Sequence, residues 1–521
     1  MERITSGLVS FYKWAVSIIF FIIIAALTIA SLISTAYVTP DLDESTYYQW
    51  DNPLVHLAVL ALLTTITLML LRRKKVQEAI TRINTDAACY KKWRNILLFI
   101  LAAMGIIWVL CTQFIPDVDQ WRVQIAVEEI NNGDIQSFVP SGYMSDYPQQ
   151  FGLFWVCLTA SKIFGSCNYT VFQLFSTAST VLFAYELTRL SEHFKAKNII
   201  KLLMVAVCIA FLPLTLYQAF VYGNLMGLAL STAALRHECD YFKSGNKGHI
   251  LASLLLITLA MIIKSNYLIV MVGMAGYAVV EALRQKKLRI MIIVVLMLVC
   301  YLVQSKGILK ATQALTGQEL NRGVSNWAYV AMGLHNGENP GWFDAYVFFS
   351  MEKYNYTPEL QTEDAKADIK ASIKNYIEHP DEFLSFIVKK NASEWNNPTF
   401  QGFWVIQFRD SAITPPGWVE WLLHGSGYEI LTYLLNLLQT LILIGTCYYM
   451  IACRMKDSFV TSLTPALIFI GGFVFHCFWE AKAQYTFSYF VLIIPYACIG
   501  YYHMLHMIRA KYIQAKKREE K

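Results

Sequence analysis

Long apolar stretches alternate with short polar segments along most of this 521-residue chain. Stretches of about 17 to 25 apolar residues are long enough, or nearly so, to cross about 30 Å of hydrocarbon as helices. The pattern therefore predicts about twelve transmembrane helices, at 14–37, 53–71, 95–112, 170–188, 201–220, 222–237, 249–263, 266–282, 289–304, 430–452, 458–476 and 486–507. A further apolar stretch, 151–164, is short for a span.

The composition supports this interpretation. With 56% hydrophobic and 15% charged residues, the chain is too apolar for a soluble domain. The first apolar stretch lacks a small-residue cleavage site and is too long for a signal peptide, so we expect it to be retained as a helix. The eleven cysteines include no CxxC pair, which argues against a disulfide framework or a zinc site. We predict an all-α polytopic membrane protein.

Basic residues gather in short clusters that indicate how the chain is oriented. These are "RRKK" at 72–75, "KKWR" at 91–94, "RQKKLR" at 284–289 and the tail that begins at Arg509. Such clusters favour the cytoplasmic side, and they do not suggest nucleic-acid binding. Both termini and 453–458 are then cytoplasmic, and the extracytoplasmic segments are 38–52, 114–150, 306–429 and 477–485.

The region 151–188 does not fit easily into this order of cytoplasmic and extracytoplasmic segments. The loops 189–201 and 238–248 are also rich in Lys and Arg, so 151–188 has to cross the membrane only once. We expect 151–164 to be a half-length or re-entrant helix buried in protein. The alternative, that one basic loop lies outside, stays open.

The first outer loop, 114–150, begins with polar residues directly after a predicted span. Asp117, Asp119 and Arg122 come first, and apolar residues then recur at helical spacing, at Val123, Ala126, Val127 and Ile130. This pattern predicts a helix in the membrane interface. Asp119 precedes that helix, where a carboxylate is either an N-cap or a catalytic group at the membrane surface.

A few polar residues interrupt other apolar stretches near the same predicted outer face. Lys264 lies within about 30 otherwise apolar residues, and a buried ionisable group in a membrane segment is costly enough to suggest function. Glu480 and Lys482 lie where a later span meets the outer face, and Asn224 follows the helix-breaking Pro213. The simpler alternatives are that Lys264 snorkels to the interface and that Glu480 pairs only with Lys482.

Several motifs resemble those of GT-C glycosyltransferases, in particular bacterial family-39-type enzymes related to protein O-mannosyltransferases and aminoarabinose transferases. They are "DVDQWRVQIAVEEINNGD", "YPQQFGLFWV" and "SKIFGS" in and after the first outer loop, "NYIEHPDEFLSFIVKKNASEWNNPTFQGFW" at 375–404, and "WEAKAQYTFSYFVLIIPY". The resemblance covers most of the chain from about residue 95. It implies a GT-C-like bundle at 95–305, preceded by an N-terminal two-helix addition and cytoplasmic loop at 1–94.

The resemblance also implies roles for single residues. Asp119 matches the family's general base better than Asp117, and Lys264, Lys482 and Arg122 are candidates to bind the donor phosphate. Candidates to shape or position the cavity are Glu480, Tyr485, Tyr147 and Asn224. The chain departs from the family in Gln120 after Asp119 and in Gln484 before Tyr485. No cofactor is required, although a divalent metal on Asp117 and Asp119 is an alternative.

The implied reaction is inverting transfer of a sugar from a polyprenyl-phosphate donor to a cell-envelope acceptor, which is a glycan, a lipid or a protein. Two alternatives stay open. A polymerase of lipid-linked oligosaccharides would use similar chemistry, whereas a flippase or transporter of lipid-linked sugars would break no bond. We see no inverted repeat of hydropathy, and the long outer loops are asymmetric, which argues against a carrier.

The outer segment 306–429 is too long for a simple turn. Alternating apolar and charged residues predict one or two amphipathic helices that end near Lys390 and cap the cavity. Trp395 and Arg409 are weak candidates for acceptor binding, although an interfacial aromatic belt predicts much the same composition. The last segment, 430–521, then holds the C-terminal helices and a basic cytoplasmic tail.

Overall fold

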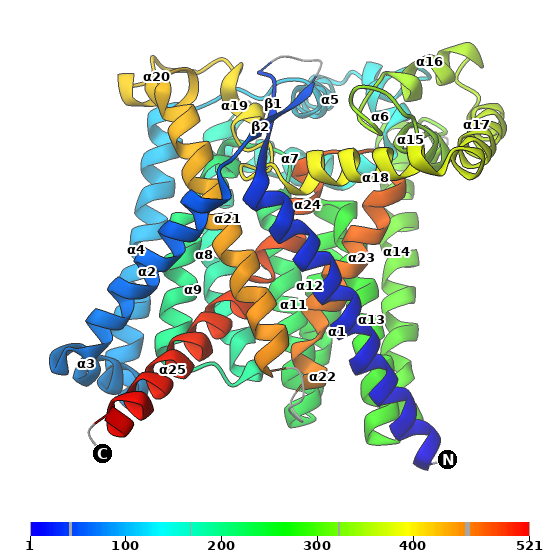
Figure 1. Cartoon of the computed structure of the whole chain (residues 1–521). Coiled ribbons are helices and arrows are strands. Elements are labelled where there is room, and N and C mark those ends of the chain that lie inside the picture. The colour runs from blue at the N-terminus through cyan, green and yellow to red at the C-terminus, as the bar shows by residue number, and fades with distance from the viewer. Residues whose placement is uncertain (1, 41–43, 167, 321–322, 454–458, 520–521) are drawn as a thin grey trace.

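The computed structural model describes residues 2–40, 44–166, 168–320, 323–453 and 459–519. Long helices run side by side as a bundle (Figure 1), and they are α1 (Glu2–Ile33), α2 (Pro53–Arg72), α4 (Ala87–Thr112), α8 (Tyr169–Leu190), α9 (Asn198–Ala210), α11 (Asn224–Ser244), α12 (Lys247–Ile263), α13 (Leu268–Gln285), α14 (Met291–Thr316), α21 (Ser426–Cys453), α23 (Thr464–Phe478), α24 (Ala483–Val491) and α25 (Ile494–Glu519).

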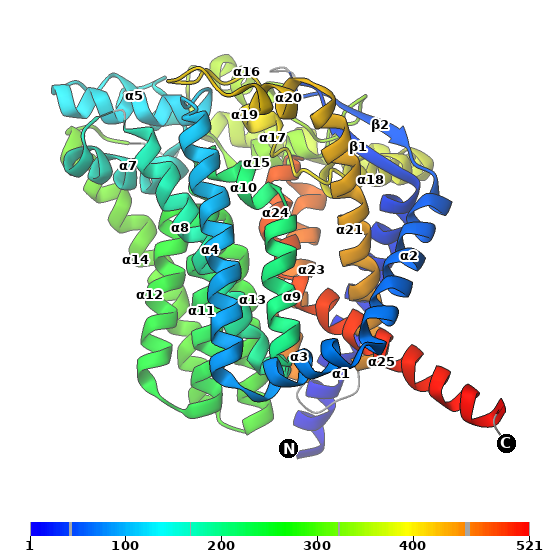
Figure 2. The same cartoon turned by 90° about the vertical axis from the view of Figure 1, so that its left-hand side faces the viewer.

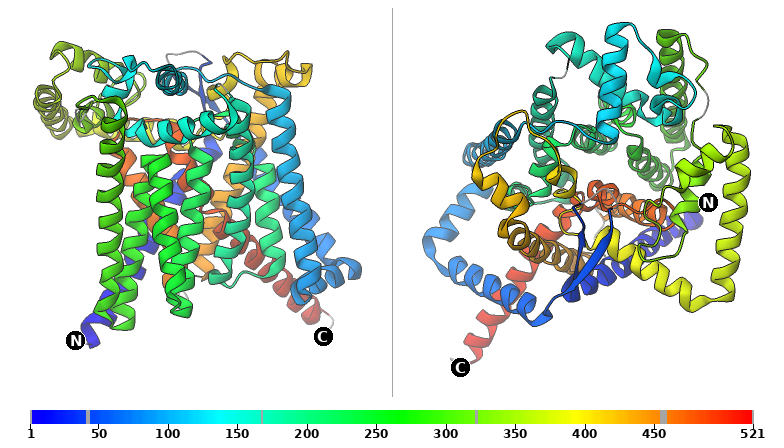
Figure 3. Two further views of the ribbon diagram at one scale, coloured as in Figure 1. Left: turned by 180° about the vertical axis from the view of Figure 1, so that it is seen from behind. Right: turned by 90° about the horizontal axis from the view of Figure 1, so that it is seen from above.

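Shorter elements gather over one end of this bundle, which we call the cap end (Figures 1 and 3). They are β1 (Ser34–Val38), β2 (Thr46–Trp50), α5 (Asp119–Asn132), α6 (Tyr143–Asp146), α7 (Phe151–Phe164), α15 (Asn326–Gly333), α16 (Tyr346–Lys353), α17 (Pro358–Glu378), α18 (Pro380–Trp395), α19 (Trp404–Gln407) and α20 (Gly417–His424). At the opposite end lie both chain ends with α3 (Lys74–Thr85) and α22 (Phe459–Ser462). Single turns, η5 (Ser265–Tyr267) among them, join several of these helices.

The helices are long and apolar enough for several membrane crossings. Among the described residues, seven helices have the length and hydropathy of a span, on α1, α2, α4, α13, α14, α21 and α23, and two bent helix pairs raise the number to as many as nine. Figure 2 shows α8, α11 and α12 running alongside them. The chain is a helical polytopic membrane protein. The count of about twelve spans stays a prediction.

Two of the predicted spans are broken helices. The stretch predicted at 201–220 bends by 64° between α9 and the turns at Pro213–Ala219, and that predicted at 486–507 bends by 50° between α24 and α25. Pro213 and Pro495 stand at the start of the second helix in each pair. Proline has no N–H and clashes with the preceding turn, so a continuous helix was the wrong prediction at both places.

A two-stranded hairpin interrupts the all-α pattern that we predicted. The first helix ends at Ile33 rather than at 37, and β1 pairs with β2 in antiparallel register from Ser34 opposite Trp50 to Val38 opposite Thr46. Both strands are rich in β-branched and aromatic residues, which favour extended backbone. The N–H of Ala36 also donates to the carbonyl of Asn396 at 3.0 Å, which fixes the hairpin to the end of α18.

The segments predicted to lie outside, 38–52, 114–150, 306–429 and 477–485, meet at the cap end, as far as they are described (Figures 1 and 3). Which side of the membrane this end faces stays a prediction, as do the domain limits. The inner loop at 453–458 lies almost entirely outside the described residues. Two amphipathic helices, α17 and α18, form in the outer segment, and α18 continues to Trp395 rather than ending near Lys390.

Candidate active site

The loop after α4 is held against a distant part of the chain before α5 begins. The N–H of Ile115 donates to the carbonyl of Asp410 at 2.8 Å, and Phe114 forms a β-bridge with Ser411. Val118 then adopts a φ of 51°, a strained conformation for a β-branched residue. Because Val118 is the N-cap and makes no side-chain capping bond, Asp119 is the first helical residue, and the N-cap alternative is wrong.

The Asp119 carboxylate is exposed at the start of α5 and accepts a hydrogen bond from a tyrosine of another helix junction. The hydroxyl of Tyr222, just before α11, donates to Asp119 Oδ2 at 3.3 Å, and the Gln150 side-chain amide donates to that same hydroxyl. The Lys264 ammonium lies 3.8 Å from the centre of the Tyr222 ring. Tyr222 therefore contacts both Asp119 and Lys264.

Lys264 follows directly after α12 and precedes η5, outside the helical spans. Burial lowers its pKa to about 7, although the Asp119 carboxylate acts in the opposite direction, and Lys482 lowers it further. Burial penalises the charged form of an amine because that form loses its hydration. The ammonium and the neutral amine are therefore both populated near neutral pH.

Glu480 and Lys482 lie in the short loop between α23 and α24, where they form a buried charge cluster with Glu44 of the N-terminal hairpin. Lys482 Nζ is 2.9 Å from Glu44 Oε1 and 3.8 Å from Glu480 Oε1. The Tyr485 hydroxyl donates to Glu480 Oε2 at 3.1 Å, and the Gln401 amide donates to Glu44 at 3.3 Å. Two carboxylates thus share one lysine.

Burial sets the protonation of this cluster. It raises the pKa of Glu480 to about 7, an effect that Lys482 opposes and Glu44 and Asp119 reinforce. Burial lowers the pKa of Lys482, but Glu44 and Glu480 outweigh it and hold that pKa above its usual value. Because the charge of Asp119 influences Glu480, Lys482 and Lys264, these four residues belong to one electrostatic neighbourhood.

Asp117 is bound by a separate cation. Arg409 Nη1 lies 2.7 Å from Asp117 Oδ2, and the Arg409 side chain is only 3% exposed. The other oxygen, Oδ1, accepts the N–H of Val118 at 2.7 Å. A divalent cation shared by Asp117 and Asp119 would have to displace this arginine, so the two carboxylates do not fit a metal site, and we derive no step through one.

Tyrosines surround the exposed carboxylate. The rings of Tyr143 and Tyr147 lie 4.8 Å apart, and Tyr329 of α15 stacks on Trp479 at 5.1 Å. Burial raises the pKa of Tyr143, Tyr147 and Tyr329, and the charge of Asp119 raises it further. These hydroxyls therefore stay protonated and can donate hydrogen bonds to a bound ligand.

Lys390 of α18 links the cap helices to the loop that carries Glu480. Its ammonium donates to the carbonyls of Gly333, Trp479 and Cys477, the last two at 2.7 and 3.3 Å. Burial lowers the pKa of Lys390 to about 8. The Lys390 ammonium is therefore satisfied by backbone carbonyls, and it links α18 to α15 and to the end of α23.

Three of the predicted site residues lie apart from this cluster. Trp395 is 1% exposed and packs on Phe469 at 4.8 Å, so neither face of its ring can stack on an acceptor sugar, and the prediction for it was wrong. Arg122 is exposed on α5 and, within the described ranges, makes no ion pair with the cluster. Asn224 is buried, and its carbonyl accepts a hydrogen bond from Tyr267.

The structure adds two residues that the sequence analysis missed, Glu44 and Tyr222. Glu44 stands in the acidic, polar segment "PDLDEST", which has the composition of an exposed turn. Tyr222 lies in "FVYGN", where an aromatic residue at the end of a span is ordinary. Only the folded hairpin and the bend after Pro213 bring these side chains to Lys482 and Asp119.

A second cluster of possible metal ligands lies among α11 and α12, near their junction. The ligand atoms of His237, Asp240 and His249 lie within 4.8 Å of one another. Arg236, however, donates to Asp240 at 2.7 Å and approaches His237 Nε2 at 2.8 Å. A guanidinium so close to two ligands repels a cation, so we assign no metal to this cluster.

Comparisons with solved structures found weak similarity to proteins that include AglB and ArnT. No family model and no curated protein matches the chain. Archaeal oligosaccharyltransferase AglB from Archaeoglobus fulgidus, in complex with an inhibitory peptide and a dolichol-phosphate, is similar over 81% of this chain with 11% identity and a TM-score of 0.40. This chain spans about half of AglB, 51% of its length.

ArnT from Cupriavidus metallidurans is also similar at 11% identity, with a TM-score of 0.32. Its apo structure matches over 79% of this chain and its complex with undecaprenyl phosphate over 78%, in each case covering 78% of ArnT. With TM-scores this low, we take no residue role from either protein.

Proposed function

We propose that this protein is a membrane glycosyltransferase that moves a sugar from a polyprenyl-phosphate donor to an acceptor at the cap end, with Asp119 as the general base. The observation that carries the proposal is that Tyr222 contacts both the exposed Asp119 carboxylate and the Lys264 ammonium at the junction of bundle and cap. A lipid-linked donor has its tail in the bilayer and its phosphate at this level. The cluster offers that donor both a base and cations.

In the proposed reaction, the Asp119 carboxylate removes the proton of an acceptor hydroxyl as its oxygen attacks the anomeric carbon. The bond between that carbon and the phosphate oxygen breaks on the opposite face, and polyprenyl phosphate leaves with the electron pair. The configuration at the anomeric carbon is thereby inverted. A positioned base contributes about 10²–10⁴-fold to such a rate. Tyr222 orients the carboxylate through its hydrogen bond.

We assign the main phosphate contact to Lys264 rather than Lys482. Lys482 is already balanced by the carboxylates of Glu44 and Glu480. Lys264, by contrast, has no carboxylate within 4 Å among the described residues, and its closest aromatic partner is the Tyr222 ring. An ammonium without a bound carboxylate is better placed to stabilise the charge that grows on the departing phosphate.

The proposal is tested by following release of polyprenyl phosphate from a polyprenyl-phosphate sugar by the purified, reconstituted protein with a cell-envelope acceptor. Asp119→Asn should lower the rate by about 10²-fold or more, because the amide cannot accept the proton. Asp134→Asn, on an exposed residue after the same helix, is the matched control and should leave the rate unchanged. Normal turnover by the Asp119 variant would rule out this base.

A carrier of lipid-linked sugars is the second candidate, because one observation favours it. The helix pairs α9/α10, where α10 is Pro213–Leu216, and α24/α25 are broken within the bundle, and discontinuous helices are common in transporters. In liposomes, a carrier would move a labelled lipid-linked sugar across the bilayer without cleaving it. The glycosyltransferase would instead yield free polyprenyl phosphate and a glycosylated acceptor.

A further inference from the structure

The end of the bundle opposite the cap carries a concentrated positive charge. Residues 72–94 hold eight lysines and arginines against Glu78 and Asp86, so this segment has a net charge of +6, the same as the whole chain. The segment comprises α3 and the start of α4, and Figures 1 and 2 place α3 across this end of the molecule, between the ends of α2 and α4.

Carboxylates neutralise little of this charge. The ion pairs within the segment, Lys74 with Glu78 and Arg82 with Asp86, are long, at 3.9 Å, and exposed. Among the described residues no carboxylate lies within 4 Å of Lys75, Lys91 or Lys92. Arg284 at the same end, by contrast, contacts Glu281 at 2.7 Å. The segment 72–94 therefore keeps most of its positive charge at the corner formed by α3 and the start of α4.

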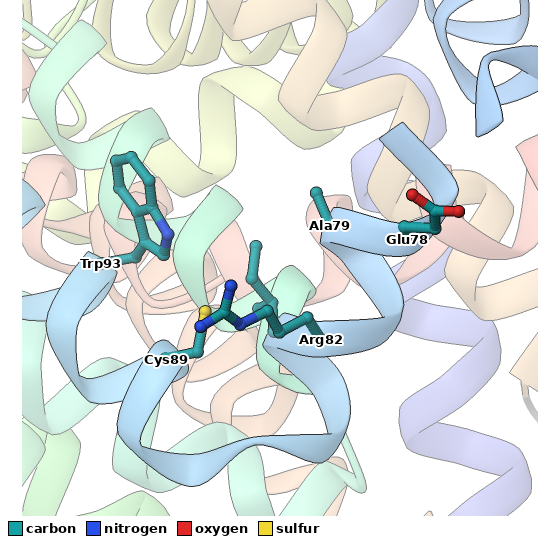
Figure 4. Close-up of a pocket in the computed structure, with 6 residues that line it drawn as sticks. Glu78, Ala79, Arg82, Cys89 and Trp93 are labelled. Carbon is teal, nitrogen blue, oxygen red and sulfur yellow. The ribbon is translucent and has the colours of Figure 1, made fainter. Parts of the chain in front are cut away.

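This corner also contains a cavity of about 260 Å³, which we call the α3–α4 pocket. It is lined by Glu78, Ala79, Arg82, Ile83, Cys89 and Trp93. Figure 4 shows the Arg82 guanidinium reaching toward Cys89, between Trp93 on one side and Ala79 on the other. The lining thus combines apolar side chains with the Arg82 guanidinium and, at one edge, the Glu78 carboxylate, which pairs with Lys74.

The neighbouring helix α2 faces lipid. Only 6% of its apolar stretch is buried by the rest of the protein, against 39% for α1. Because α2 leads directly into α3, the α3–α4 pocket lies at the level where the hydrocarbon ends and headgroups begin. Trp93 is 46% exposed there, and tryptophan favours this interfacial depth.

We propose that the α3–α4 pocket binds the headgroup of an anionic phospholipid from the leaflet at this end of the protein. Arg82 contacts the lipid phosphate, the surrounding lysines supply the long-range attraction, and Trp93, Ala79 and Ile83 contact the glycerol and upper acyl region. A signal that only orients the chain needs positive charge but neither a pocket nor an exposed indole. This site does not rest on the proposed function.

The test is native mass spectrometry of the purified full-length protein titrated with phosphatidylglycerol or phosphatidylcholine. Wild type should bind phosphatidylglycerol more tightly. Arg82→Gln should weaken that binding about fivefold, because one cation near an anionic surface contributes about this factor. Phosphatidylcholine binding should hardly change. The matched control, Lys370→Gln on exposed α17 at the cap end, should bind both lipids as wild type does.

Trp93→Ala provides a second variant, and it should weaken binding of both lipids because it removes an apolar contact rather than a charge. The melting temperature of each variant verifies folding, and soluble glycerol phosphate tests whether the headgroup alone suffices. The proposal is overturned if wild type does not prefer phosphatidylglycerol, if Arg82→Gln binds as tightly as Lys370→Gln, or if glycerol phosphate binds as well as the lipid.

Discussion

At the scale of single residues, the candidate site is defined by two groups whose pKa values are shifted toward each other. Burial lowers the pKa of Lys264 to about 7 and raises that of Glu480 to about 7. Below this pH, Lys264 is charged and Glu480 is neutral, whereas above it Lys264 is neutral and Glu480 is charged. Both changes make the site more negative as the pH rises.

Because the site becomes more negative as the pH rises, lipid binding should depend on pH. The affinity for polyprenyl phosphate, without a sugar, should fall as the pH rises through about 7, and Lys264→Arg should flatten much of this fall because arginine stays charged. Binding is measured by fluorescence or native mass spectrometry between about pH 5.5 and 8.5. Lys370→Arg is the control. A Lys264→Arg profile that matches wild type would refute the role of this lysine.

The sequence could reveal some of these residues and not others, for a physical reason. Lys264 stands out because an isolated charge in an apolar stretch is costly, and Asp119 because it follows a span directly. Glu44 and Tyr222 do not stand out, because acidic residues are normal in turns and aromatic residues are normal at the ends of spans. The structure brings Tyr147 and Tyr485 near Asp119 or Glu480, whereas Trp395 belongs to the core.

At the scale of elements, the N-terminal hairpin connects the first helix to the site. Thr46 donates through its N–H and its hydroxyl to Asn339 Oδ1, at 2.9 and 2.7 Å. The Asn396 amide donates to the carbonyls of Ala30 and Ser34 at 3.3 and 2.7 Å. These bonds hold the two strands next to Glu44, which pairs with Lys482. Hydropathy could predict the long helices but not this hairpin, whose strands depend on contacts with α18.

Removing one of these anchors should destabilise the fold. Asn396→Ala breaks the bonds to the partly buried carbonyls of Ala30 and Ser34, which costs about 1–3 kcal/mol. Thermal unfolding in detergent and proteolysis of the hairpin measure this loss. Asn375→Ala on α17 is the matched control, because its single side-chain bond, to Glu382, is exposed. Equal melting temperatures for the two variants would contradict the anchoring role.

At the scale of the whole molecule, the first two helices differ in how they join the bundle. On α1, Phe20 is fully buried and contacts the rings of Phe469 and Tyr496 at 5.4 and 5.7 Å. On α2, Leu62 is 58% exposed and faces lipid. The first helix is therefore part of the packed core, although the sequence motifs begin only near residue 95.

This difference predicts unequal effects of truncating the two side chains. Phe20→Ala leaves a cavity among packed helices and should cost about 3–5 kcal/mol. Leu62→Ala truncates a side chain that contacts lipid rather than the protein core, so it should lower the stability little. Thermal unfolding in the same detergent compares them. Equal destabilisation by Leu62→Ala and Phe20→Ala would contradict the position of α1 in the packed core.

The orientation of the molecule is also testable. If the basic loops are cytoplasmic, Lys370→Cys on α17 should react with a membrane-impermeant maleimide in intact cells, whereas Lys287→Cys after α13 should react only after permeabilisation. Both positions are exposed. Labelling of the wild-type protein gives the background from the native cysteines. The opposite pattern would place the cap in the cytoplasm.

The carbonyl contacts of Lys390 also bear on the route by which the proposed lipid-linked donor would reach Asp119. If α18 swung outward, this ammonium would lose its bonds to Gly333, Trp479 and Cys477, and a buried cation without partners is costly. The loop with Glu480 is bound to the cap by a further bond, since the N–H of Ala481 donates to the carbonyl of Gly341, between α15 and α16, at 2.7 Å. Entry of the donor by lateral diffusion from the bilayer, while the cap helices stay in place, is therefore favoured over entry through the cap.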